Sequence, residues 1–290
     1  MSCTAAAEAT FGPSNLEQTL NAHALTQTPL AADNGGGFHA PSIADFFPDA
    51  VLFEGTIFEL TRIRIALVLM TLLIAALFAI AMRNPQRVPR GGQNVAEVAI
   101  DFVRNTVASE SLGKKEGNRY LPYLVTLFFF VLGANVLAIT PGVDIAASST
   151  IGLPFLLAML TWLIYHVQGI REHGVFGYIK VQTVVPGVPK LLAPVVILLE
   201  ALQALIIRPF SLMLRLMANM MAGHILLVLF FSGASYLLLH GEGLLPVAGA
   251  GSAVMGLLFT GFELFVAALQ AYIFTLLTAM YINMAIGHEH

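Results

Sequence analysis

The sequence predicts an all-α, polytopic membrane protein with about five membrane-embedded helices and an interfacial amphipathic helix. Of its 290 residues, 57% are hydrophobic and only 11% are charged, and the mean hydropathy is +0.81. A soluble globular domain carries about 25% charged residues. Five apolar stretches are also long enough to reach into a bilayer, which a helix crosses with about 20 residues. Together these observations exclude a soluble fold.

The N-terminal 61 residues differ from the rest, and we expect them to form an acidic, largely disordered extension that faces the outside. They contain seven acids and no Lys or Arg. The extension therefore lacks the basic region of a secretory signal and the arginines of a mitochondrial presequence. Its glycine run at 34–37 and scattered prolines are typical of poorly folded segments. Residues 62–290 then form the integral membrane domain.

The first three apolar stretches each suit a single crossing of the bilayer. They cover residues 65–82, 121–140 and 153–169. Basic residues gather in the connections 83–119 and 171–190, so the positive-inside rule places these connections, and the C-terminus, on the inner side. Arg62 and Arg64, at the outer end of the first stretch, count mildly against this orientation.

An amphipathic helix is expected between the first two stretches. Val95, Ala99, Phe102, Val103 and Val107 follow helical spacing and form one apolar face. Such a helix, flanked by lysines, is typical of a segment that lies in the inner membrane interface. A short helix that faces water is the alternative.

The last two apolar stretches, residues 191–232 and 252–287, are too long for one perpendicular crossing. As helices they measure roughly 63 and 54 Å, against a hydrocarbon core of about 30 Å. Either the helices break, at positions such as Pro194 and Pro209, or they form a long, steeply tilted antiparallel hairpin. We favour the hairpin. The loop between them is expected at 233–251, with a turn at the glycine-rich patch 249–251.

A polar stripe crosses the fourth stretch, where Arg208, Ser211, Arg215 and Asn219 share one helical face. An arginine cannot lose its charge, and its burial in hydrocarbon costs from about 2.5 to more than 10 kcal/mol. Arg215 is therefore expected to face a partner, a water-filled cavity or a moving counter-charge.

A second polar stripe, formed by Glu263, Gln270 and Tyr281, follows the final helix. If Arg215 faces Gln270 in an antiparallel pair, His224 comes opposite about residue 261 and therefore near Glu263. A His–Glu pair at one depth and an Arg–Gln pair at another form a layered polar path, which packing alone does not explain.

Plainer interpretations stay open for three of these residues. Arg208 can extend to the inner interface, Glu200 can cap the helix or pair with Arg208, and His224 can bond to a carbonyl group in the core. The other histidines show no metal-ligand spacing, and the chain has no phosphate-binding loop or nucleophile motif. We expect no metal, no cofactor and no nucleic-acid binding.

Two blocks, residues 208–224 and 263–281, resemble subunit a of the F-type rotary ATP synthase, the stationary proton-channel subunit of its membrane sector. A weaker likeness extends from about residue 93 to the end. The resemblance implies that Arg215 is the essential arginine of the family, Asn219 its channel asparagine and Gln270 its hairpin glutamine. His224 and Glu263 stand where some bacterial relatives have an acid and a histidine.

The inner half-channel implied by the resemblance includes Glu200, Arg208 and Tyr281. One departure concerns Glu200, because many relatives have an acid seven residues before the basic-Pro position. Glu200 lies eight residues before Arg208.

The function implied by the resemblance is proton translocation that drives rotation and ATP synthesis, without catalysis by this chain itself. Its partners are the c-ring, the b subunits of the peripheral stalk, the lipid bilayer and protons. Each rotor carboxylate must be protonated to travel through lipid. Arg215 stabilises its ionised form and separates two offset half-channels, of which the outer includes Asn219, His224 and Glu263.

Other functions remain as alternatives. A sodium-coupled version of the same subunit is compatible with this chain, because ion choice depends mostly on the rotor. A stand-alone ion transporter predicts inverted repeats, and none is found. A membrane-embedded enzyme requires a ligand cluster that the scattered histidines do not supply. We expect the chain in a bacterial plasma membrane, with the mitochondrial inner membrane as the alternative.

Overall fold

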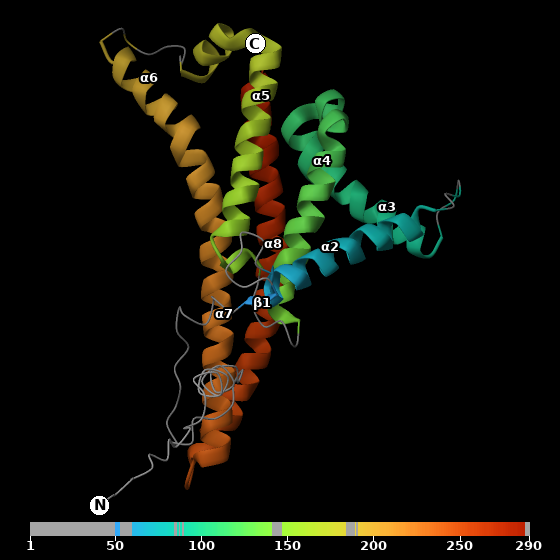
Figure 1. Cartoon of the computed structure of the whole chain (residues 1–290), viewed down its shortest axis with the longest axis vertical. Coiled ribbons are helices and arrows are strands. Elements are labelled where there is room, and N and C mark those ends of the chain that lie inside the picture. Colours follow the sequence, from blue (N-terminus) through green and yellow to red (C-terminus); the bar gives the residue numbers. More distant parts are fainter. Residues whose placement is uncertain are drawn as a thin grey trace, which may run out of the picture. The chain divides into compact units, whose positions relative to one another are not determined.

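The computed structural model confirms an all-α, polytopic protein. It has five helices that are long and apolar enough to cross a membrane (Figure 1). All described residues belong to the unit Ala40–His290, and they are residues 50–52, 60–83, 86, 88, 90–140, 147–183, 189 and 191–287. Most of the predicted N-terminal extension, the loop 141–146 and residues 288–290 lie outside this set.

The described part of the chain begins with a short antiparallel pair of strands, β1 (Ala50–Leu52) and β2 (Leu60–Thr61). Helix α2 (Arg62–Ala81) follows directly, and the Thr61 hydroxyl accepts a hydrogen bond from the Arg64 backbone N–H at 3.4 Å. Helix α2 packs on α4 but leaves most of its large apolar side chains exposed. An apolar helix with so little internal cover is typical of a membrane span that contacts lipid or another subunit.

A helical hairpin precedes and includes the second span. Helix α3 (Gly92–Val103) continues into a π-helical segment, η2 (Arg104–Ser109), and then into α4 (Glu110–Val136). Gly113 has φ +74°, a backbone conformation that glycine tolerates best. The chain turns there, so α4 runs back along η2 (Figure 1).

The amphipathic helix forms where it is expected, but its apolar face is divided between two surroundings. Val103 and Val107 are fully buried against the bundle, whereas Val95 is 69% exposed and Phe102 is 45% exposed. The buried part holds the hairpin together. The exposed part remains available to the membrane interface.

Gly117 allows the closest contact in this hairpin, and replacing it with alanine is expected to destabilise the fold. A Cβ atom at Gly117 would lie 2.7 Å from the Ala108 carbonyl oxygen, a backbone atom that cannot move independently of η2. Overpacking of this kind costs about 1–3 kcal/mol or more. We expect a lower thermal midpoint for the purified Gly117→Ala protein in detergent.

The matched control for this substitution is Gly251→Ala, another glycine inside a helix. Nothing lies within 4 Å of a Cβ atom at Gly251. Alanine is the better helix former by about 1 kcal/mol, so this variant should keep or raise the thermal midpoint. Equal midpoints for the two variants would contradict the close approach at Gly117.

Helix α5 (Gly152–Thr183) contains a second sharp turn, at Gly174, with φ +70°. A Cβ atom at Gly169 would lie 2.2 Å from the Tyr178 ring, so the segment after the turn lies against the segment before it. The predicted third span, residues 153–169, is the first part of this helix. Short 3₁₀ turns, η3 (Leu137–Ile139) and η4 (Ala147–Ser149), stand before it.

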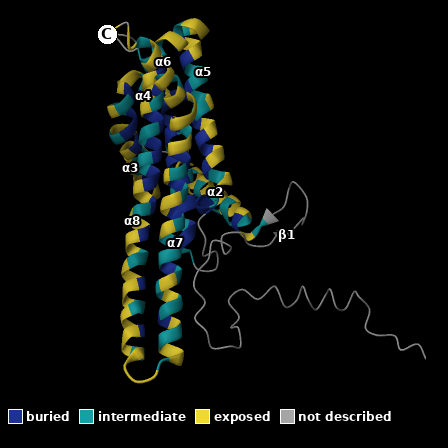
Figure 2. Ribbon diagram, turned by 90° about the vertical axis from the view of Figure 1, so that its left-hand side faces the viewer, coloured by how far each residue is buried: buried dark blue, intermediate teal, exposed yellow. Residues whose placement is uncertain are grey.

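The last two spans form a long antiparallel hairpin, as predicted. Helix α6 (Ala193–Leu202), the π-helical turn η5 (Gln203–Ile207) and α7 (Arg208–His240) are continuous, and α8 (Leu245–Ile286) returns beside α7 (Figures 1 and 2). At 1.5 Å per residue the two arms measure about 72 and 63 Å. Helices of this length must incline steeply or project from a 30 Å core. The helix does not break at Pro209.

The predicted loop at 233–251 and the turn at the glycine-rich patch are wrong. The connection covers only residues 241–244, and the patch lies inside α8. A Cβ atom at Gly249 would lie 3.0 Å from the Leu238 backbone nitrogen. The absence of a side chain there permits close helix–helix contact, which small residues commonly provide in membrane proteins.

The core lies where the other helices surround the hairpin. α4, α5, the first part of α7 and the last part of α8 bury side chains such as Leu124, Tyr165, Leu216 and Ile282. Towards the connection 241–244, α7 and α8 are mostly exposed (Figure 2). The functional side chains described below lie along this hairpin, mostly where it enters the core.

Candidate functional site

The polar stripe of α7 lies on an exposed face of the described chain. Ser211, Arg215 and Asn219 are all exposed, although they belong to an apolar helix. The neighbouring face packs inwards, with Leu212 2% and Leu216 1% exposed. The polar side chains of α7 therefore point away from the rest of this chain, towards its surroundings.

The Arg215 guanidinium has no hydrogen bond or ion pair within the described residues. A permanent cation on a membrane helix needs a partner or water. Because the described residues supply no anionic partner, the surface around Arg215 is suited to an anionic group on another molecule.

Arg208 leaves the stripe and turns into the protein. It is 3% exposed, and its guanidinium lies 5.6 Å from the centre of the Tyr281 ring, within the range of a cation–π contact. The Tyr281 ring in turn lies 6.0 Å from that of Tyr165. The structure thus brings Arg208 and Tyr281 together, and it contradicts the interpretation that Arg208 extends to the inner interface.

Glu200 lies two helical turns before Arg208 and is half-buried. In the part of the chain that the structure describes, the two residues form no ion pair, which contradicts the salt-bridge interpretation. Arg208 Nη1 is buried without a hydrogen-bond partner among the same residues. This buried donor is available to water or to a transient acceptor.

Glu263 lies against Gly223 across the hairpin, within one residue of the register predicted for His224 and Glu263. Glu263 is 3% exposed and His224 is 6% exposed. A Cβ atom at Gly223, next to His224, would lie 2.9 Å from Glu263 Oε1. The carboxylate therefore occupies the space that the glycine leaves open, and neither of its oxygens has a hydrogen-bond partner within the described chain.

Gln270 also lies on the buried face of α8, with 5% of its surface exposed. It is two turns further along the helix than Glu263. Arg215 lies on the exposed face of α7, so the two members of the predicted Arg–Gln pair stand in different surroundings. The structure thus places Gln270 inside the protein and Arg215 at its surface, and the layered path of paired residues stays a prediction.

The sequence interpretation missed a buried polar link between α4 and α8. Asn135 is fully buried and donates from Nδ2 to the Ala267 carbonyl at 3.3 Å. Its Oδ1 accepts a hydrogen bond from the Ser148 hydroxyl at 2.5 Å. Ala267 is one turn from Glu263, so this link helps to hold the part of α8 that carries the carboxylate. In the sequence, the signal for this link was the amide side chain of Asn135 within an apolar stretch.

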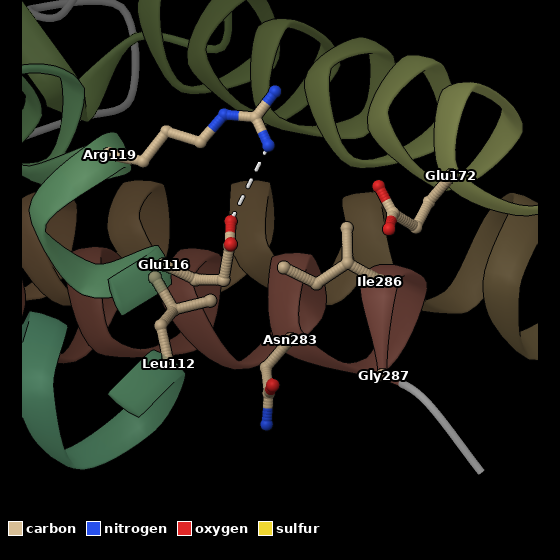
Figure 3. A pocket seen from close by; sticks show the side chains of 7 residues that line it. All are labelled: Leu112, Glu116, Arg119, Glu172, Asn283, Ile286 and Gly287. Atoms are coloured by element: carbon tan, nitrogen blue, oxygen red, sulfur yellow. Dashed lines mark ion pairs between the residues drawn. The ribbon is translucent and has the colours of Figure 1, made fainter. Parts of the chain in front are cut away.

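A cavity of about 330 Å³ opens at the end of the bundle where α8 finishes (Figure 3). It is lined by Leu112, Glu116, Arg119, Glu172, Asn283, Ile286 and Gly287. Arg119 Nη1 lies 3.5 Å from Glu116 Oε2. Asn283 is two residues, or roughly 200° of helix rotation, from Tyr281. The cavity therefore lies on another side of α8 from the Arg208 cluster.

Metal coordination finds no support at any of these places. Among the described side chains, no group of three His, Cys, Asp or Glu residues is close enough to hold a metal ion. The polar residues of the hairpin instead combine titratable groups with fixed positive charge. This chemistry suits the movement of protons and the stabilisation of a carboxylate.

Comparison with known proteins gives a consistent result. The family model described as "ATP synthase A chain" matches residues 64–283. The chain is 48% identical over 272 residues to ATP synthase subunit a of Rhodococcus erythropolis, an alignment that covers 93% of this chain and 98% of the relative. It is 43% identical to the subunit of Frankia alni, with 76% of this chain and 75% of the relative covered. The subunit of Streptomyces lividans is 38% identical, with 89% and 91% covered.

The first arm of the hairpin, α8 as far as Asn283, and every polar residue placed on the hairpin above fall within the matched region. The five apolar helices agree with a multi-pass membrane subunit. The chain therefore belongs to the ATP synthase A chain family, as subunit a of the membrane sector.

Proposed function

We propose that this chain is the stationary proton-translocating subunit of a rotary ATP synthase. The observation that carries the proposal is Arg215, a permanent cation exposed on a membrane helix without a hydrogen bond or ion pair among the described residues. Family membership supplies the complex in which such a partner would be found. The partner that fits this surface is a c-ring whose subunits each carry one carboxylate at membrane depth.

The electrostatic role of Arg215 follows from the cost of moving a carboxylate through lipid. An ionised carboxylate is strongly disfavoured there, so it travels protonated. Near Arg215 the ionised form is stabilised by the opposite charge. A carboxylate that approaches the arginine therefore gives up its proton, and the cation also prevents protons from passing directly between the two sides.

The outer half-channel of this proposal consists of Asn219, His224 and Glu263. The contact of Glu263 with Gly223 supports it, because Gly223 directly precedes His224 in α7. Imidazole and carboxyl groups can each gain and lose a proton. A pair of these groups can exchange protons near neutral pH, and Asn219 on the exposed face would connect it to the rotor.

The inner half-channel consists of Glu200, Arg208 and Tyr281 in the same proposal. The cation–π contact between Arg208 and Tyr281 supports their joint action. Arg208 Nη1 is a buried donor without a partner in the described chain, so a water molecule beside it would complete the path. Protons that leave here allow the ring to turn in one direction, and ATP is made elsewhere in the complex.

The remaining partners and the location follow from the same assignment. The exposed apolar surface of α2 suits contact with lipid or with the b subunits of the peripheral stalk. The relatives named above are bacterial, which favours a bacterial plasma membrane.

Disulfide cross-linking tests the proposed rotor surface. In a chain with Cys3→Ser, we expect Ser211→Cys to cross-link to a cysteine placed beside the carboxylate of the c subunit, because Ser211 is exposed. Leu212→Cys is the matched control, since Leu212 is 2% exposed on the neighbouring, packed face. Cross-linking in the assembled complex is measured by gel mobility under non-reducing conditions. Equal yields at both positions, or none at Ser211, would refute the assignment of this face.

A further inference from the structure

We propose that Tyr165 is a positioning residue. Its hydroxyl group fixes the π-helical turn before Arg208, and this turn sets the rotation of α7 about its axis and so which of its side chains face outwards. The structural part of this inference stands on hydrogen bonds within the chain. Its consequence for proton transport rests on the proposed function of the Arg215 face.

Pro209 creates the need for such a residue. The Arg208 backbone N–H donates to the Gln203 carbonyl, five residues earlier, which is the π-helical pattern. It is therefore not directed at the Ala204 carbonyl, its partner in an α-helix. In the π-helical pattern the donor for Ala204 would be residue 209, but proline has no N–H. The Ala204 carbonyl is thus left without a backbone donor.

Tyr165 supplies the missing donor from a different helix. Its hydroxyl donates to the Ala204 carbonyl at 2.6 Å. Both residues are buried, with Tyr165 1% and Ala204 3% exposed. A buried carbonyl without a partner is costly, so this bond stabilises the turn in its present form. It also ties α5 to the junction between α6 and α7.

The turn decides which side chains α7 presents to its surroundings. Beyond it, Arg215 is exposed while Leu212 and Leu216 are buried. A shift of the turn by one residue rotates the following helix by about 100°. Such a rotation would carry Arg215 away from the exposed face and bring an apolar neighbour towards it.

The Tyr165 ring makes a second connection to the polar path. It lies 6.0 Å from the Tyr281 ring, which itself lies 5.6 Å from the Arg208 guanidinium. The same side chain therefore holds the backbone of the turn and supports the aromatic surface over Arg208. No other described residue makes both contacts.

The test compares Tyr165→Phe with Tyr123→Phe in the intact complex. Each substitution removes one tyrosine hydroxyl that forms a hydrogen bond between helices. The Tyr165 hydroxyl extends from α5, and the Tyr123 hydroxyl, on α4, bonds to Thr161 of α5 at 3.2 Å. Only Tyr165→Phe should accelerate hydrogen–deuterium exchange in peptides covering 203–213. We expect a rise of about two- to tenfold there, with a comparable fall in proton-driven ATP synthesis, which is the effect of one net hydrogen bond. Equal behaviour of the two variants would overturn the inference.

Pro209→Ala provides a rescue that a general loss of packing would not produce. An N–H at position 209 can donate to the Ala204 carbonyl, so the hydroxyl of Tyr165 is needed less. In the Pro209→Ala protein, Tyr165→Phe should change the hydrogen–deuterium exchange of peptides covering 203–213, and the rate of ATP synthesis, by less than about twofold. If the effects of the two single substitutions on ATP synthesis multiply in the double variant, the inference is overturned. If Tyr165→Phe alone prevents assembly, recovery of assembly with Pro209→Ala supports the inference, and continued failure overturns it.

The two proposals fail in different ways. Normal ATP synthesis in an Arg215→Ala complex would refute the proposed function, while the exchange response to Tyr165→Phe would persist. An absent exchange response would refute the role of Tyr165 and leave the assignment of Arg215 unaffected.

Discussion

Replacing Arg215 with alanine should abolish proton-driven ATP synthesis while the complex still assembles. The side chain is exposed, and its removal breaks no hydrogen bond or ion pair among the described residues. Loss of one preorganised electrostatic partner of a developing charge commonly reduces a rate about 100- to 1,000-fold. We expect at least a 100-fold fall, measured in membrane vesicles at matched complex content.

Two further variants make the Arg215 result specific. Arg215→Lys keeps the charge but replaces the broad guanidinium with a compact ammonium group, and we expect most of the synthesis to be lost. Arg62→Ala removes an exposed arginine from the start of α2 and should retain synthesis. Near-normal synthesis in the Arg215→Ala complex would return this residue to a structural role.

Glu263→Gln should have the second largest effect. The amide has the shape of the carboxyl group but does not titrate, so a proton relay through this position stops. Proton transfer by a positioned side chain commonly contributes about 100- to 10,000-fold, and we expect at least a tenfold fall in both ATP synthesis and ATP-driven proton pumping. Thermal stability should change little, because neither carboxylate oxygen has a hydrogen-bond partner to lose within the described chain.

The control for this change is Glu242→Gln, which alters an exposed glutamate in the connection 241–244. It should leave both activities unchanged. The exchange of the two partners, His224→Glu with Glu263→His, should recover part of the activity lost in either single variant. Wild-type synthesis with Glu263→Gln would exclude this carboxylate from the proton path.

The sequence was most informative where physical constraints act over long stretches. Excess apolar length predicted the hairpin, and the spacing of polar residues predicted its register to within one residue at Glu263. Both depend on helix geometry, which every residue of a long helix obeys. The glycine-rich patch at 249–251 was misjudged because glycine serves turns and close helix contacts alike. Only the neighbouring helix distinguishes the two uses.

Individual side chains were harder to predict, because their surroundings come from distant parts of the chain. Arg208 and Arg215 look alike in sequence, yet one is buried beneath Tyr281 and the other is exposed. Tyr165 and Asn135 reach partners 39 and 132 residues away. No local pattern indicates such contacts, although a polar group in an apolar span always raises the question of what satisfies it.

The wide turn at 203–207 also sets the orientation of Glu200 relative to Arg208 along the continuous arm from α6 to α7. In a regular α-helix, eight residues amount to 800°, which leaves the two side chains roughly 80° apart. A π-helical turn accommodates one additional residue, so the flanking helices relate as if seven residues separated them, roughly 20° apart. The turn thus keeps Glu200 on the side of the helix that carries Arg208. Deletion of Leu205 would convert the turn to an ordinary helix and leave both faces in place.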